Sequence, residues 1–120
     1  MPTAKHIEML RLLHSQTLKG VTAWETTAED DVYLASFPSY GVAIRSWDAS
    51  DGTGYSLQIT NNEGSVVAEL RAGDFEGPDL RVSEAYSLLK ETFEGARRIA
   101  MGVDQAVDSI LDNLRSQQAA

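Results

Sequence analysis

Residues 55–71 read YSLQITNNEGSVVAELR, and this stretch decides the fold. Apolar and polar side chains alternate over residues 55–60, which is the period of a strand with one buried face. Residues 61–64 then supply the Asn-Asn-Glu-Gly sequence typical of a hairpin turn. The alternation resumes over residues 66–71. The stretch therefore predicts two antiparallel strands joined by a tight turn.

The same two-residue period extends toward the N-terminus. It predicts further strands at residues 21–27, 32–37 and 40–47, with a glycine-containing loop at residues 48–54 before the next strand. Because a parallel crossover needs about a dozen residues or more, the short connections force neighbouring strands to pair antiparallel. We expect a five-stranded β-meander with one buried and one largely wet face.

Helical spacing flanks this meander on both sides. Apolar side chains recur three and four residues apart over residues 4–19, with Thr3 as a candidate cap and Gly20 just after the end. A second helix is expected to start between Asp79 and Ser83. Its apolar stripe runs on to Leu114 with hardly a change of phase.

Gly102 leaves two interpretations of this C-terminal region. One uninterrupted helix of about 34 residues would measure roughly 50 Å, so its far end would need a partner. Alternatively, Met101 and Gly102 close one helix and Asp104 caps another, which the sequence favours. We therefore expect a single α+β domain over residues 1–120, with one long broken or two C-terminal helices.

Composition and charge exclude several classes of function. The 120 residues include no cysteine, so disulfides, thiolate metal sites and thiol nucleophiles are excluded. The net charge of −8 repels phosphate backbones, so we expect no nucleic-acid partner. No segment approaches the roughly 18 apolar residues of a membrane span. We therefore expect a cytoplasmic protein without a membrane partner.

The sequence contains no motif that predicts catalysis or metal binding. His6 and His14 lie eight residues apart on the predicted first helix, too far to share a metal ion. A calcium loop starting at Asp48 would need glycine at the position of Thr53 and glutamate at that of Ile59. We therefore expect no catalytic residue, no metal and no cofactor.

Three aromatic residues on the strands are candidate binding residues. If the side that carries Val21 and Ala23 packs on the helices, Trp24 lies on the open face of the sheet. Tyr33 and Trp47 alternate with apolar neighbours in the same way, which predicts an aromatic patch suited to a partner. Core packing is the commoner role of such rings, so both placements remain open.

The adjacent arginines Arg97 and Arg98 are further candidates. Arg97 borders the apolar stripe, where its guanidinium could pair with a carboxylate such as Glu25 or Glu94. The simpler alternative is an exposed pair near a helix C-terminus, which the helix dipole favours.

These residues also carry a resemblance. The chain resembles a widespread family of short bacterial α+β proteins of uncharacterised function, and the matching segments are Leu18-Lys-Gly-Val-Thr-Ala-Trp24-Glu25-Thr26, Tyr33-x-Ala35, the Gly64 hairpin, Ala96-Arg97-Arg98-x-Ala100-x-x-Val103-Asp104 and Ile110-Leu111-x-x-Leu114. The resemblance implies a stand-alone bacterial domain and transfers no activity. It also implies that Trp24, Glu25, Arg97 and Arg98 are spatially linked.

The sequence thus predicts a protein-interaction module without catalytic chemistry. We expect a homodimer or another protein partner, bound through the C-terminal helices or the open sheet face. A more specific version is an accessory bacterial protein, such as an immunity protein or a secretion chaperone. The rival hypothesis is a small-molecule-binding domain or small enzyme. Its pocket would lie between the sheet and the C-terminal helices, lined by Glu25, Arg97 and Arg98.

Overall fold

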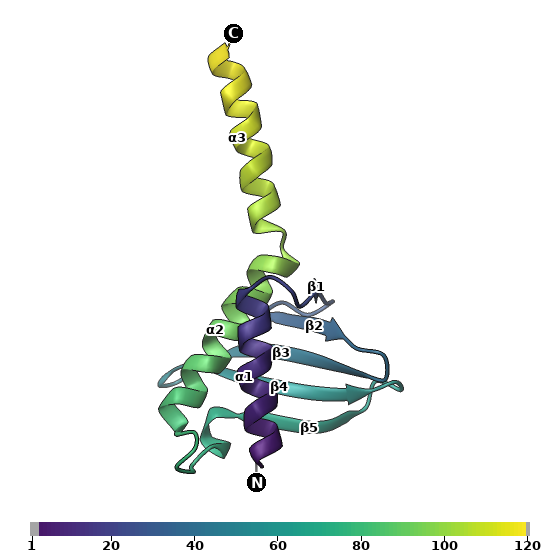
Figure 1. Cartoon of the computed structure of the whole chain (residues 1–120), viewed down its shortest axis with the longest axis vertical. Coiled ribbons are helices and arrows are strands. Elements are labelled where there is room, and N and C mark those ends of the chain that lie inside the picture. The colour runs from purple at the N-terminus through teal and green to yellow at the C-terminus, as the bar shows by residue number, and fades with distance from the viewer. Residues whose placement is uncertain (1–2, 120) are drawn as a thin grey trace.

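The computed structural model describes residues 3–119, and over that range the chain forms one five-stranded antiparallel sheet and three α-helices. The elements are α1 (Ala4–Leu18), β1 (Trp24–Thr26), β2 (Val32–Ser36), β3 (Tyr40–Ala49), β4 (Gly52–Asn61), β5 (Val66–Arg71), the short 3₁₀ helix η1 (Ala72–Asp74), α2 (Val82–Ala100) and α3 (Val103–Ala119). The strands lie side by side in sequence order, so the predicted meander is confirmed (Figure 1).

The strand boundaries differ from the prediction at two places. β3 and β4 pair as far as Ala49 opposite Gly52, so most of the loop predicted at residues 48–54 is strand. β1 has three residues, whereas seven were predicted. The amides of Val21 and Thr22 both donate to the carbonyl of Gln16 at the end of α1, which keeps these two residues out of the sheet.

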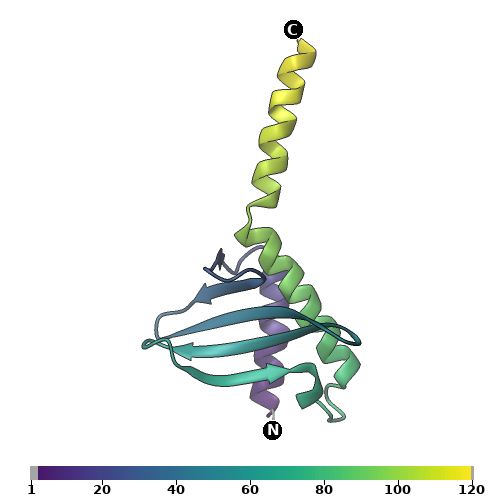
Figure 2. The same cartoon turned by 180° about the vertical axis from the view of Figure 1, so that it is seen from behind.

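Both α1 and α2 lie on one face of the sheet. They stand in front of the strands in Figure 1 and behind them in Figure 2, which shows the opposite face without a helix over it. The core lies between these layers, where Leu10 of α1 and Leu89 of α2 meet Ile44 and Leu57 of the central strands. One buried and one wetter face is the arrangement that the strand alternation predicts.

The structure decides between the two placements left open for Trp24 and Tyr33: both rings lie in the core, not on the open face. Trp24 is only 3% exposed and Tyr33 is also buried in the core, whereas Val21 is exposed. The Tyr33 ring centroid lies 5.5 Å from that of Phe93 in α2. The indole N–H of Trp24 donates to Thr17 Oγ1 at 3.0 Å, and a tryptophan with such a partner is readily buried.

The break between the C-terminal helices is confirmed. Gly102 has φ +63°, a left-handed conformation in which glycine is favoured, and its carbonyl accepts the amide of Ala106 at the start of α3. The prediction that Asp104 caps α3 is wrong. α3 begins at Val103, so Asp104 lies within the first turn.

α3 points away from the rest of the molecule. Every side chain described in it, from residue 103 to residue 118, is exposed, and the molecule measures 61 Å along one axis but only 33 and 27 Å along the others (Figure 1). The radius of gyration is 16.8 Å, compared with about 14 Å for a compact chain of this length. The helix does not fold back on the core.

Candidate interaction surfaces

The α3 stripe is the first candidate surface. It comprises five exposed apolar side chains, which are Val103, Val107, Ile110, Leu111 and Leu114. At about 100° per residue they fall within an arc of roughly 100°, the width of the apolar face of a helix that packs on a globular surface. The charged residues Asp108, Asp112 and Arg115 lie outside this arc.

An ion pair fixes the junction between α2 and α3. Arg98 donates to Asp104 Oδ1 from Nε at 2.9 Å and from Nη2 at 2.6 Å. The contact raises the pKa of Arg98 and lowers the pKa of Asp104. Both groups are exposed, so the pair adds little stability, but two donors on one oxygen restrict the direction in which α3 leaves the domain.

The second candidate surface is a groove between α1 and the sheet, with a volume of about 630 Å³. We call it the α1 groove. It is mostly apolar, and its lining is Lys5, Glu8, Met9, Leu12, Leu13, Gln16, Thr22, Phe37, Tyr40, Val42 and Ile59. In Figure 1, the end of the sheet with the β2–β3 turn reaches beyond α1.

The third candidate surface is a hollow of about 550 Å³ that lies where β3 and β4 meet the end of α2. We call it the third hollow. Its lining includes Arg97, Arg98 and the carboxylates of Asp31, Asp48 and Glu94. Both arginines are exposed, and this mixed set of charges faces solvent. Within the hollow, burial raises the pKa of Tyr55, and the neighbouring Tyr86 and Glu94 raise it further.

The four residues that the resemblance links divide between different places. Trp24 is in the core, whereas Glu25 is exposed on β1, opposite Leu34 of β2. Arg97 and Arg98 line the third hollow, whose lining does not include Glu25. Arg97 forms no ion pair with Glu25 or Glu94 among the residues described.

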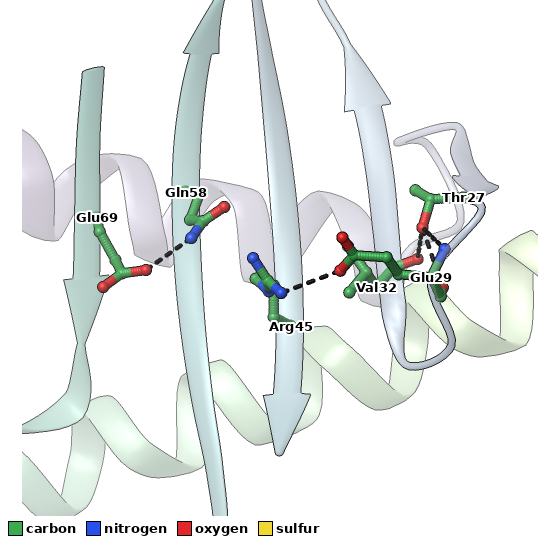
Figure 3. Close-up of polar contacts among 6 residues, drawn as sticks. All are labelled: Thr27, Glu29, Val32, Arg45, Gln58 and Glu69. Atoms are coloured by element: carbon green, nitrogen blue, oxygen red, sulfur yellow. Dashed lines mark hydrogen bonds and ion pairs between the residues drawn. The ribbon is translucent and has the colours of Figure 1, made fainter. Parts of the chain in front are cut away.

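The open face of the sheet is the fourth candidate surface, and it is polar. Arg45 of β3 pairs with Glu29 of the β1–β2 turn at 3.0 Å, and Gln58 of β4 donates to Glu69 of the adjacent strand β5 at 2.7 Å (Figure 3). The hydrogen bond from Gln58 and the nearby Arg71 hold the pKa of Glu69 below its usual value. This face is therefore not an aromatic patch.

Trp47 lies on the open face, as predicted, but its ring packs against other residues of the sheet. The guanidinium carbon of Arg71 is 4.8 Å from the centroid of its ring. The ring also covers Gly54 of β4, where any side-chain carbon would overlap the indole atoms of Trp47. A glycine opposite a tryptophan allows the ring to lie flat on the sheet.

The sequence interpretation missed the α1 groove. Met9 and Leu12 were visible as extra apolar positions that broaden the stripe of the first helix, and Phe37 and Tyr40 flank the Pro38-Ser39 turn. These two signals lie about 25 residues apart, and only the fold brings them together. The α3 stripe, by contrast, was detectable from its spacing alone.

Histidines and carboxylates do not combine into a metal site in the described part of the chain. Across residues 3–119, no three side chains of the His, Cys, Asp and Glu types gather closely enough to hold a metal ion. His14 instead contacts Glu91 at 2.9 Å and so links α1 to α2. Over the same range, no helix is long and apolar enough to cross a membrane.

No family model, curated protein or solved structure matches this chain. The family resemblance carried by residues 18–26 and 96–104 therefore stays a prediction. The geometry of the four surfaces is the basis for the function proposed below.

Proposed function

We propose that this protein is a non-catalytic protein-interaction module that forms a homodimer through α3. One observation carries the proposal: the α3 stripe lies wholly outside the core, although its five side chains are as apolar as core residues. An unpartnered helix of this length is marginal in water, because most helical stability in proteins comes from packing of the apolar face. A partner that covers the stripe would supply that packing.

The energetics favour such a partner. Full burial of a Val, Leu or Ile side chain is worth about 1.5–3 kcal/mol, and the five side chains of the stripe are about half exposed. Covering the stripe therefore contributes roughly 1 kcal/mol per residue. This gain is available in every copy, so an assembly of two identical chains gains it twice.

Mass in solution tests the proposal. Light scattering is expected to give twice the chain mass of 13.1 kDa at micromolar concentration. Ile110→Asp, which places a charge in the stripe, is expected to give a monomer. Ser109→Asp is the matched control, because it introduces the same charge one residue away on the polar side of α3, and it should leave the dimer intact. A wild-type monomer at high concentration would contradict the proposal.

The rival function rests on the third hollow, whose lining includes Arg97 and Arg98 but not Glu25. Two arginines there would suit an anionic ligand. Arg98 is already neutralised by Asp104, and its side chain is 64% exposed, so the hollow offers little desolvated positive charge. An NMR titration with inorganic phosphate that shifts the Arg97 and Arg98 signals at submillimolar concentration would favour this rival.

A further inference from the structure

The two apolar surfaces are complementary in shape. The α1 groove is a concave apolar surface beside a helix, and the α3 stripe is a convex apolar face on a helix whose main neighbour within the described chain is α2. We propose, on the basis of the proposed homodimer, that α3 of each protomer docks in the α1 groove of its partner, so that two copies exchange their C-terminal helices reciprocally.

The lengths of the two surfaces agree. Along α1, the groove extends from Lys5 to Gln16, which are eleven residues apart. Along α3, the stripe extends from Val103 to Leu114, also eleven residues apart. At 1.5 Å per residue, each surface is about 16 Å long. A stripe of this length fills the groove from end to end.

The width of the stripe favours a groove over a second α3. Pairing of two helices as a coiled coil needs only a narrow seam, here Val103, Val107, Ile110 and Leu114. Leu111 lies to one side of that seam and broadens the stripe to roughly 100°. In an isolated helix pair Leu111 would stay partly in water, whereas the walls of a groove cover it.

The amount of surface points the same way. A stable dimer interface contains about 20–30 residues on each side. The α3 stripe alone supplies five of these, which is far too few. Reciprocal exchange uses both the stripe and the eleven groove residues of each protomer, and their neighbours at the rim bring the interface close to this range.

The direction of α3 is compatible with a two-fold axis. α3 starts at the same end of the domain as the C-terminal end of α1, where the backbone of Gly95 lies against Thr17 (Figures 1 and 2). An axis at this end brings the partner's helix in beside Gln16 and directs it toward Lys5. α3 would then run antiparallel to the partner's α1 and bring Val107 level with Leu12.

Disulfide trapping tests this register directly, because the chain has no native cysteine. The double variant Leu12→Cys/Val107→Cys is expected to form a covalent dimer on mild oxidation, since a disulfide requires Cα atoms within about 7 Å. Leu12→Cys/Ser109→Cys is the control for the face of α3, and each single cysteine variant is a control for self-pairing. Little covalent dimer is expected from these controls.

A charge in the groove provides the second readout. Leu12→Asp is expected to weaken the dimer at least tenfold in sedimentation. Leu18→Asp is the matched control: both leucines are on α1 and similarly exposed, at 55% and 57%, but only Leu12 lines the groove. Leu18→Asp should leave the dimer unchanged.

The outcomes separate this inference from the proposed function. If the wild type is a monomer, the proposed homodimer and the helix exchange are both contradicted. If it is a dimer that Ile110→Asp disrupts but no Leu12→Cys/Val107→Cys disulfide forms, α3 binds at a different place on the partner. The proposed function then stands and the exchange is overturned, whether Leu12→Asp disrupts the dimer or leaves it intact. A covalent dimer together with disruption by Leu12→Asp, but not by Leu18→Asp, supports the exchange.

Discussion

At the scale of single residues, Thr17 illustrates how closely this small core is packed. Its hydroxyl accepts the indole N–H of Trp24, and its methyl group faces Gly95 of α2. A side-chain carbon added at Gly95 would lie only 2.8 Å from Thr17 Cγ2. One threonine therefore sets both the burial of the tryptophan and the distance between α1 and α2.

This contact predicts a coupling between two substitutions. Gly95→Ala gains up to about 1 kcal/mol of helix propensity but forces α1 and α2 apart, at a cost of about 1–3 kcal/mol. We expect a net loss of stability in urea unfolding. Thr17→Ser removes the obstructing methyl group and keeps the hydroxyl for Trp24, so Gly95→Ala should be neutral or stabilising in that background. Additive effects of the two changes would contradict the close contact.

Glu69 on the open face predicts a dependence of stability on pH. Its carboxylate accepts hydrogen bonds from Gln58 and Arg71, and its pKa is lowered in the folded state. The resulting stability is present above the unfolded pKa of about 4.3 and is lost as the pH falls through the lower folded pKa.

Glu69→Gln is therefore expected to reduce the loss of stability between neutral pH and pH 3. Because the group is partly exposed, the difference should be about 0.5 kcal/mol. Urea unfolding at both pH values measures it, and Glu63→Gln in the β4–β5 turn is the control. An equal acid dependence in wild type and Glu69→Gln would show that this carboxylate is not stabilised by folding.

At the scale of elements, the sequence predicted the type and order of every long segment but not which way β1 and β2 face. The alternation shows that Trp24 and Glu25 point to opposite sides, yet it does not identify the helix side. That choice depends on contacts with the helices that form only in the folded chain. Thr17 of α1 accepts the indole N–H of Trp24, and Phe93 of α2 packs on the ring of Tyr33. The α1 groove was missed for the same reason.

The Gly102 break makes a prediction about α2 and α3. Alanine in the left-handed conformation costs about 1–2 kcal/mol, so Gly102→Ala should favour one continuous helix. In such a helix Arg98 and Asp104 are six residues apart, which places them about 120° apart around the axis and about 9 Å apart along it, so their ion pair cannot form.

The Nε–H signal of Arg98 in NMR spectra reports this change. It should lose its hydrogen-bonded shift in Gly102→Ala and keep it in Gly102→Asn, because asparagine tolerates the left-handed conformation. The same shift in both variants would mean that the glycine conformation does not define the junction.

At the scale of the whole molecule, removal of α3 is expected to change how thermal stability depends on protein concentration, but not the stability of the domain itself. No side chain described between residues 103 and 118 is buried, so a chain that ends at Gly102 retains the whole core. Its thermal midpoint should match that of the full chain at low protein concentration. The full chain should gain stability as its concentration rises, because association of folded copies pulls the equilibrium toward the native state.

A series of thermal unfolding curves over a hundredfold range of protein concentration distinguishes the two chains. The full chain is expected to show a midpoint that rises by several degrees, and the shortened chain a constant one. Ser109→Asp should follow the full chain and Ile110→Asp the shortened one. If the shortened chain is unfolded at every concentration, α3 contributes to the core and the stripe is not free for a partner. If both midpoints are constant, the stripe has no partner among copies of this chain.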